Sequence, residues 1–468
     1  MKLTSKRKGF SLPSSTVMLF ILICIVAVLT YILPAGQYGT IVDPVTKVTK
    51  VDAASFAFKA NTPVTFFRLF VSIAQGFIDG AMIIFLIIFG YFWVFSVVGS
   101  GAISAGIHKL LGSKFKNSKL FIPASFIIFA LAGSTYGEFE TVYGLIPIFV
   151  ALAIALGYDA IVGLCMSGMA VAVGFASATT NPFTIGIAQS IGELPIFSGL
   201  LYRWLVFVVF VVVCIYLVMR YADKVKRDPT KSIVYGEDYS TFNFVNTDAK
   251  EEPFTKLHKI LLCGMVVTIA VIVYGSLRLN WYINEMSGVF LISGIVSQLI
   301  AGKKPNEIGD SLVKACAEMS VAIIIVGLSR TVLVILKSGN IIDTVIYGLY
   351  QPMKNAPTWL TGELMLIVQN IINFFIPSGS GQATAIMPIM IPLADLAHVN
   401  RQVAVLAYQF GDGYSNLLWP TAACSIMCGI AKVPLGKWYK FFLPIFGVMF
   451  ILQSIFVIAA TIFGYGPF

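Results

Sequence analysis

Long apolar stretches alternate with short polar segments along the whole chain, and this pattern predicts helices that cross a membrane. A helix needs about 20 predominantly apolar residues to span a bilayer. Two amphipathic stretches, 63–79 and 305–317, are predicted instead to lie along the membrane interface. Simple spans are predicted at about 15–35, 81–99, 200–221, 260–277, 284–301, 319–336 and 440–462.

Two further apolar stretches contain glycine and polar residues at their centres. Stretch 120–157 is interrupted at 133–141, where two glutamates stand at membrane depth, and stretch 359–398 is interrupted at 377–382. Charged side chains and glycines in such places are poorly suited to a simple helix that faces lipid. Both stretches are therefore predicted to be re-entrant hairpins, the first entering from the cytoplasmic side and the second from outside.

Two more stretches are predicted to be broken helices. Stretch 160–196 is interrupted at 177–182, and stretch 402–431 is interrupted at 411–416. Unwound backbone at membrane depth is tolerated only where protein or a water-filled cavity surrounds it. Two hairpin tips and two broken helices therefore predict one polar site near the middle of the bilayer.

The order of these elements is repeated, which indicates two related halves. Residues 100–103 (SGAI) correspond to residues 338–341 (SGNI), and each set follows a span preceded by an amphipathic stretch. We predict a first repeat over 1–221, a cytoplasmic linker over 222–259, and a second repeat over 260–468. One extra span at the start of the second half would invert it. The predicted fold class is an all-α polytopic membrane protein with two inverted-topology repeats.

Composition and charge agree with a multi-pass protein of the cell (inner) membrane. The 468 residues are 58% hydrophobic and only 12% charged, whereas soluble domains are about 25% charged. The net charge of +10 is carried by short basic segments between the apolar stretches. This positive-inside pattern places the N-terminus in the cytoplasm and makes the lipid bilayer, not nucleic acid, the expected partner.

Catalytic and metal chemistry are not indicated. The seven cysteines lie almost all in apolar stretches and the three histidines form no cluster, so no metal and no cofactor are predicted. An intramembrane enzyme would need a nucleophile with its base, or a metal shell. An ion channel is a further alternative, but a repeat with buried acids favours alternating access by a carrier.

Polar residues at the four interruptions are the candidate substrate-binding residues. Hydroxyl and amide side chains there could hydrogen-bond a small solute, although such residues also serve as helix-packing contacts. The uncharged candidates are Ser134, Thr135, Thr141, Thr180, Asn181, Ser378, Gly379, Ser380, Gln382, Ser415 and Asn416.

Four charged residues complete the candidate site: Glu138, Glu140, Asp412 and Arg330. A charge at the membrane centre costs at least about 3 kcal/mol, so each acid is expected to have a partner or to bind a proton. Arg330 could bind a substrate carboxylate in bidentate fashion or pair with one of the acids. This charge balance suits a zwitterionic or cationic solute, whereas a dicarboxylate would need a co-transported cation or protonated glutamates.

The chain resembles the YfcC-type branch of the C4-dicarboxylate anaerobic carrier (DcuC-like) family over nearly its whole length. Each motif is weakly specific alone, and the combination is specific. The motifs are SST at 14–16, LTYILPAGQY at 29–38, GEFE at 137–140, ATTNPFTIG at 178–186, Ser329-Arg330, PSGSGQ at 377–382 and GDGYSN at 411–416.

The resemblance implies membership of the ion transporter superfamily, whose proteins are typically homodimers with a scaffold and a moving elevator part. Members of this branch are often described as basic amino acid or arginine/ornithine antiporters, while the family name refers to C4-dicarboxylates. The expected function is therefore exchange of amino acids, most of all cationic ones. The alternative is a dicarboxylate carrier coupled to Na⁺ or H⁺.

Overall fold

The computed structural model describes residues 13–42, 49–111, 119–137, 139–242, 254–279 and 281–466. Glu138, a predicted site residue, lies outside these described residues, as do residues 243–253 of the predicted linker. The described chain is mostly helical and contains one two-stranded sheet.

All seven stretches predicted to be simple spans are helices. Six of the described helices are long and apolar enough to cross a membrane, and α1 is a somewhat shorter apolar helix. These helices are α1 (Ser15–Ile32), α3 (Ala81–Val98), α10 (Leu200–Arg227), α11 (Lys256–Arg278), α12 (Ile283–Ile300), α14 (Ser320–Ser338) and α20 (Leu435–Ile462).

The two predicted amphipathic segments are also helices, α2 (Phe66–Asp79) and α13 (Pro305–Glu318). Phe66 and Phe67 of α2 are about four-fifths exposed, as expected for a helix that lies at a membrane surface. Short helices and turns complete this part of the chain: α4 (Ala102–Leu111), α15 (Ile342–Tyr350), η5 (Pro229–Lys231), η6 (Ser240–Phe242) and η7 (Gln351–Asn355).

Two paired strands, which we call the β-hairpin, follow α1 in a stretch for which the sequence predicts neither a span nor an amphipathic helix. Strands β1 (Gly36–Val42) and β2 (Thr49–Phe58) pair antiparallel, with an irregularity between Gln37 and Gly39. The Phe56 ring stacks on Tyr347 of α15 with ring centroids 4.1 Å apart. The β-hairpin therefore packs on a helix that lies about 300 residues later in the sequence, a contact that the local sequence does not reveal.

Three of the four predicted interruptions are where the sequence places them. The described chain is not helical at 136–137, 139, 177–181 and 376–378. The flanking elements are α5 (Phe121–Thr135), η2 (Glu140–Gly144), α6 (Ile146–Ala155), α7 (Ala160–Leu164), the π-helical η3 (Cys165–Met169), α8 (Ala170–Ala176), the π-helical η4 (Pro182–Gly186), α9 (Ile187–Ile191), α16 (Thr358–Phe375) and α17 (Gly379–Leu396).

The fourth interruption was predicted too early. Helix α18 (Arg401–Ser415) continues through the expected break at 411–416, and the chain leaves the helix only at 416–422 before α19 (Ala423–Ile430). The two glycines allow close packing instead. A Cβ atom on Gly413 would lie 2.3 Å from the Ala176 Cα, and one on Gly411 would lie 2.3 Å from the Gln369 Cβ.

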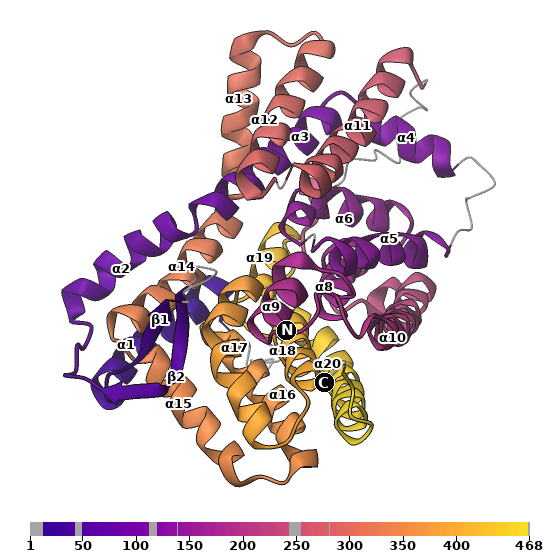
Figure 1. Ribbon diagram of the computed structural model, residues 1–468. Coiled ribbons are helices and arrows are strands. Elements are labelled where there is room, and N and C mark those ends of the chain that lie inside the picture. The colour runs from indigo at the N-terminus through magenta and orange to yellow at the C-terminus, as the bar shows by residue number, and fades with distance from the viewer. Residues whose placement is uncertain are drawn as a thin grey trace, which may run out of the picture.

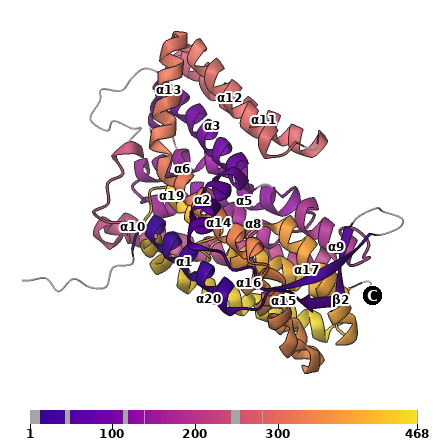
Figure 2. The ribbon, with the colours of Figure 1, turned by 90° about the vertical axis from the view of Figure 1, so that its left-hand side faces the viewer.

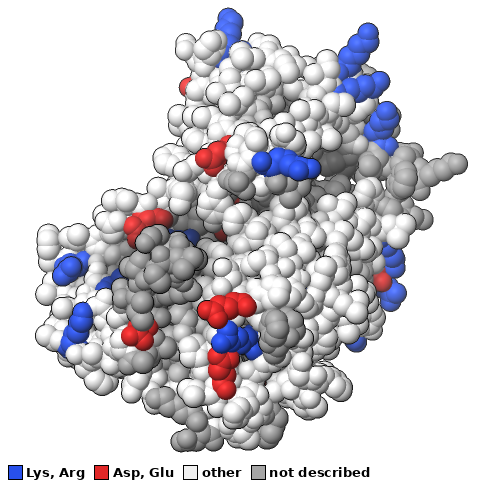
Figure 3. Space-filling view, viewed as in Figure 1, with Lys and Arg blue, Asp and Glu red and all other residues white. Residues whose placement is uncertain are grey.

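Helices α3, α11, α12 and α13 project from the rest of the molecule as one group, which we call the projecting bundle (Figures 1 and 2). Helix α18 lies in the interior of the remaining body, and every residue from Gln402 to Ser415 is buried. Lys and Arg side chains are most numerous toward the end formed by the projecting bundle, and others lie along both sides of the visible face (Figure 3). Most of the visible surface carries no charge, as expected for a protein in a bilayer.

We predict that Gly413→Ala will lower stability, because its new methyl group would collide with backbone of α8. Overpacking of this kind typically costs about 1–3 kcal/mol. The measurement is the thermal unfolding midpoint of the purified protein in detergent. Gly447→Ala in α20 is the matched control, because nothing lies within 4 Å of its new methyl group. Equal midpoints for the two variants would contradict the prediction.

Candidate functional site

The interruptions of both halves meet around one cavity of about 270 Å³. Residues of the first half that line it are Gly137, Phe139, Glu140, Tyr143, Phe175, Phe183 and Thr184. Residues of the second half that line it are Pro377, Ser378, Gly379, Ser380, Asn416, Thr421, Ala422, Ala423 and Ile426. The remaining wall comes from the ends of α2, α3 and α12 and from α14.

Six of the predicted site residues line this cavity. They are Glu140, Arg330, Ser378, Gly379, Ser380 and Asn416. The volume lies just below the 300–1,000 Å³ typical of sites for drug-sized ligands, so it suits a small metabolite. The convergence of the four interruptions, on which the sequence-based hypothesis depended, is therefore present in the fold.

The charges on the cavity wall are Glu140 from η2, Arg330 from α14 and Asp79 from the end of α2. The ion pairs found among the described residues do not include Arg330. Arg330 nevertheless interacts electrostatically with Glu140, so both roles considered for Arg330 stay predictions.

Asp79 was not predicted as a site residue. Its carboxylate accepts a hydrogen bond of 2.7 Å from Gln75 in the same helix. The sequence feature that could have revealed Asp79 is its position as the last residue of an amphipathic helix, directly before the glycine that precedes a span. Aromatic rings from Phe183 and Tyr282, with centroids 5.8 Å apart, form a further part of the wall that the sequence did not reveal.

The N-terminus of α17 faces the cavity through Ser378, Gly379 and Ser380. Ser378 is the N-cap, and its hydroxyl accepts a hydrogen bond from the Gly381 amide at 3.3 Å. A helix N-terminus carries a partial positive charge, which attracts anionic groups. The cavity thus offers positive potential from Arg330 and α17 beside the negative charge of the acids.

The remaining uncharged candidates of the first half hold the interruptions together and do not line the cavity. Ser134 donates to the Ser177 carbonyl at 3.2 Å, and Thr180 donates to the Thr135 carbonyl at 2.9 Å. Asn181 caps η4 by accepting from the Phe183 amide at 2.9 Å. For these residues the observed contacts are those of helix packing.

Three further candidates have similar bracing contacts. Thr141 donates to the Met286 sulfur at 2.9 Å. Gln382 donates to the Gln369 side chain at 2.6 Å, and Ser415 donates to the Gly411 carbonyl at 2.5 Å. Asp412 is fully buried in α18 and also does not line the cavity.

Side chains of α18 donate hydrogen bonds to carbonyl groups that lie beside the interruptions. Gln409 donates to the Phe175 carbonyl at 2.7 Å, and Tyr408 donates to the Gly379 carbonyl at 2.6 Å. The hydroxyls of Tyr414 and Ser177 are 2.6 Å apart. Helix α18 of the second half is thereby bonded to the broken helix of the first half.

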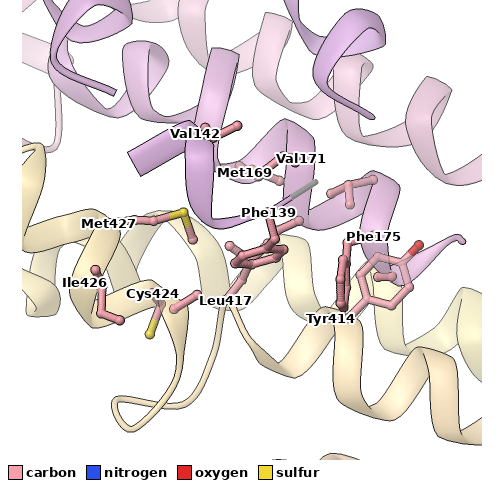
Figure 4. Close-up of a cluster of buried hydrophobic side chains, with 14 of the residues drawn as sticks. Phe139, Val142, Met169, Val171, Phe175, Tyr414, Leu417, Cys424, Ile426 and Met427 are labelled. Atoms are coloured by element: carbon pink, nitrogen blue, oxygen red, sulfur yellow. The ribbon is translucent and has the colours of Figure 1, made fainter. Parts of the chain in front are cut away.

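Apolar contacts join the two halves at the same level (Figure 4). The rings of Phe139 and Phe175, both from the first half, have centroids 5.0 Å apart. Tyr414, Leu417 and Met427 of the second half lie in the same cluster. This packing fixes the position of Phe139, which precedes the cavity-lining Glu140.

A second, larger cavity of about 590 Å³ adjoins the first, since Arg330 and Ser378 line both. Its wall also includes Lys337 of α14, Asp343 of α15 and Gln37 of β1. Asp343 accepts a hydrogen bond of 3.0 Å from the Tyr38 amide of the β-hairpin. Burial raises the pKa of the Asp343 carboxyl above its ordinary value, and the hydrogen bond from Tyr38 opposes this effect.

Residues 12–462 match the model of a family described as C4-dicarboxylate anaerobic carrier, DcuC. This chain belongs to the DcuC family. It is 30% identical, over 98% of both chains, to the Escherichia coli (strain K12) protein YfcC, whose name gives a provisional assignment as a basic amino acid antiporter. It is 26% identical, again over 98% of both chains, to an uncharacterized Haemophilus influenzae protein.

Two solved transporter structures are also similar to this DcuC-family chain. The Alcanivorax borkumensis YdaH transporter matches with 17% identity and a TM-score of 0.41, over 97% of this chain and all of that one. The Neisseria gonorrhoeae MtrF structure, titled as illuminating a class of antimetabolite efflux pumps, matches with 16% identity and a TM-score of 0.43 over 97% and 96%.

The family confirms the predicted class, because DcuC proteins are membrane carriers, and the chain is a multi-pass secondary transporter. A transporter of this kind works in the lipid bilayer and binds a small-molecule substrate. The sequence motifs that resembled the YfcC-type branch were therefore read correctly.

We predict that Gln409→Leu will destabilise the site, because it leaves the buried Phe175 carbonyl without its donor. Such a loss typically costs about 1–3 kcal/mol. Gln453→Leu in α20 is the matched control, since both polar side-chain atoms of this fully buried glutamine lack a hydrogen-bond partner among the described residues. The thermal unfolding midpoint should fall for Gln409→Leu and stay level or rise for Gln453→Leu. The reverse order would refute the stabilising role of the hydrogen bond from Gln409.

Proposed function

We propose that this protein exchanges amino acids, above all cationic ones such as arginine and ornithine, across the cell membrane. The observation that carries the proposal is the cavity wall, where Glu140 and Asp79 face the same space as Arg330. An amino acid would place its ammonium or cationic side chain near the acids and its carboxylate near Arg330 or the α17 N-terminus. The name of the E. coli relative YfcC supports the same substrate class.

The alternative is a C4-dicarboxylate carrier coupled to Na⁺ or H⁺, as the family description suggests. Arg330 and the N-terminus of α17 would attract one carboxylate of such a substrate. The second carboxylate would meet Glu140 and Asp79, and this repulsion would have to be offset by a bound cation or proton. The charge balance of the described wall is the reason for preferring amino acids.

Exchange in proteoliposomes should separate these substrates. Vesicles loaded with unlabelled arginine should take up labelled arginine or ornithine faster than labelled succinate or fumarate.

Arg330→Lys should weaken apparent affinity about tenfold, because lysine cannot form the bidentate contact, worth about 1.5–3 kcal/mol per charged hydrogen bond. Glu140→Gln should impair uptake of arginine, because a neutral amide attracts a cation less strongly.

Arg220→Lys, at an exposed position of α10, is the control for the arginine variant, and Glu307→Gln, on the exposed surface of α13, is the control for the glutamate variant. Faster uptake of succinate than of ornithine by the wild-type protein would favour the dicarboxylate alternative. Unchanged apparent affinity in Arg330→Lys would remove Arg330 from the substrate site.

We further propose that transport uses an elevator movement, in which α17, α18 and α19 move with the cavity past α14. Helix α19 packs directly on α14: a Cβ atom on Gly429 would lie 3.6 Å from the Ala322 Cβ. Homodimer formation, as the resemblance implies, would let one part of each subunit stay fixed while the other moves. Cross-linking in native membranes would test the dimer.

The elevator is testable with a disulfide between Ala322→Cys and Gly429→Cys. Disulfides join Cβ atoms about 3.5–4.5 Å apart, so the two Cβ atoms are within range. The Ile325 side chain, 2.9 Å from the new Cβ atom, must shift to make room, and the Ala322 Cα lies 3.3 Å away. Oxidation of the double variant should arrest exchange, and a reducing agent should restore it. Each single cysteine variant under the same oxidant is the control. Full exchange by the oxidised, cross-linked protein would rule out movement of α19 past α14.

A further inference from the structure

We propose that Asp412 binds the proton that couples substrate movement to the proton gradient, at a place separate from the substrate cavity. This inference rests on the proposed transport function and deepens it. It assigns to Asp412 a role other than substrate contact.

The first observation is that the Asp412 carboxylate has no hydrogen-bond partner in the described part of the chain. The residue is fully buried in α18, and neither carboxylate oxygen has a hydrogen-bond donor among the described residues. A buried, unpaired carboxylate is strongly destabilised, and such groups usually become neutral instead. Asp412 therefore needs a positive charge that arrives from outside, and binding a proton makes it neutral.

The second observation is that Asp412 lies directly behind the cavity wall. A Cβ atom placed on Gly379 would lie 3.2 Å from Asp412 Oδ2, 2.7 Å from Thr184 Cγ2 and 3.1 Å from Phe175 Cζ. Gly379, Thr184 and Phe175 all line the cavity. Because glycine lacks a side chain, only a thin layer of backbone separates the carboxylate from the substrate.

The third observation concerns the polar groups around Asp412, which lack donors. The side-chain nitrogens of Gln409 and Asn373 are used, since Gln409 donates to the Phe175 carbonyl and Asn373 donates to the Asp412 main-chain carbonyl at 2.9 Å. The side-chain oxygens of Gln409 and Asn373, which can only accept, are buried without partners among the described residues, and so is the Thr184 hydroxyl, which can also donate. The two amide oxygens can be satisfied only by a donor, and a carboxylic acid can donate whereas a carboxylate cannot.

A proton is the simplest positive charge for Asp412 to bind. A metal cation needs several oxygen ligands around it, whereas a proton occupies no additional volume. The described residues also contain no group of three acid, histidine or cysteine side chains that could hold a metal ion.

Few other charges act on Asp412. Across the cavity wall stand Glu140, which repels a carboxylate, and Arg330. Helices α16 and α17, which pack against α18, each carry one acid, near the end of the helix that is farther from Asp412. Glu363 of α16 accepts a hydrogen bond from Ser454 of α20. Asp395 of α17 pairs with Arg401. No ionisable side chain is present in α8, η4 or α9. The lysines of α20 lie in its first two turns, with Tyr439 between them. Tyr408, one turn earlier in α18, donates to the Gly379 carbonyl.

This position lets protonation control the site. The Asp412 carboxylate is attracted to the partial positive charge at the N-terminus of α17. It takes up one proton from the solution on one side of the membrane and becomes a neutral acid, which lacks this attraction. Release of the same proton on the other side restores the charge. The contact between α17 and α18, and hence the shape of the cavity, then depends on whether the proton is bound.

The test compares gradient-driven accumulation with counterflow in proteoliposomes. Wild-type protein should accumulate labelled substrate when a pH difference is imposed, by up to about tenfold per pH unit for one proton. Asp412→Asn should lose this accumulation and the accompanying proton flux, read with a pH-sensitive dye inside the vesicles. Counterflow without a gradient should remain measurable, because Asn cannot titrate but leaves the cavity wall in place.

Two variants guard against a folding defect. Asp412→Glu keeps a titratable carboxyl and should retain pH-driven accumulation with a shifted pH dependence. Glu363→Gln, which changes a half-buried acid of the neighbouring helix far from the cavity, should behave as wild type. Loss of counterflow and accumulation together in both Asp412 variants would show a structural role and overturn the proposal.

Three other outcomes would also overturn it. These are accumulation by Asp412→Asn at the wild-type level, no response of the wild type to a pH difference, and accumulation driven by a Na⁺ gradient but not by protons. The assay is run with both arginine and succinate. If only succinate is transported, the proposed amino acid function fails, while the effect of Asp412→Asn on succinate accumulation still decides the proton site.

Discussion

Backbone groups released where helices break inside a membrane must find hydrogen-bond partners within the protein, because lipid offers none. In this transporter the partners come largely from α18, where Gln409 and Tyr408 donate to carbonyls beside two different interruptions. On the adjoining α16, the Phe374 carbonyl accepts from Thr421 at 2.7 Å. These bonds hold the interruptions of both halves in place, and the cavity exists only because they do.

The same requirement explains why the centre of the molecule is so closely packed. Helix α18 can reach the broken helix of the first half only because Gly413 allows it to touch Ala176. Close approach excludes water, so the carboxylate of Asp412 is far more stable when it is neutralised. In our proposal, the structural demand for satisfied backbone and the functional demand for a coupled proton therefore meet at Asp412, within one turn of Gly413.

Substrate recognition and site construction are therefore divided among different residues. Residues such as Ser134 and Asn181 use their polar atoms within the fold, while Arg330, Glu140 and Ser378 present theirs to the cavity. Arg330 also faces the second cavity beneath the β-hairpin, so one guanidinium borders both spaces. A solute that passes between the cavities would remain close to this positive charge throughout.

The sequence by itself determined the membrane class, the family, the seven simple spans and three of the four interruptions. Such features depend on local composition: a run of apolar residues must be helical in lipid, and proline with small polar residues breaks a helix wherever it lies. Glu140 and Arg330 could be chosen from sequence because a charge in an apolar stretch is conspicuous.

Only the tertiary structure decided the rest. It showed that Gly411 and Gly413 serve close packing within a continuous helix, that Asp79 joins the cavity wall, and that residues 36–42 and 49–58 form two paired strands. It also separated the polar residues that brace the breaks from those that face the solute. Each of these outcomes depends on a neighbour far away in the chain, and local sequence carries no record of which distant side chain will be adjacent.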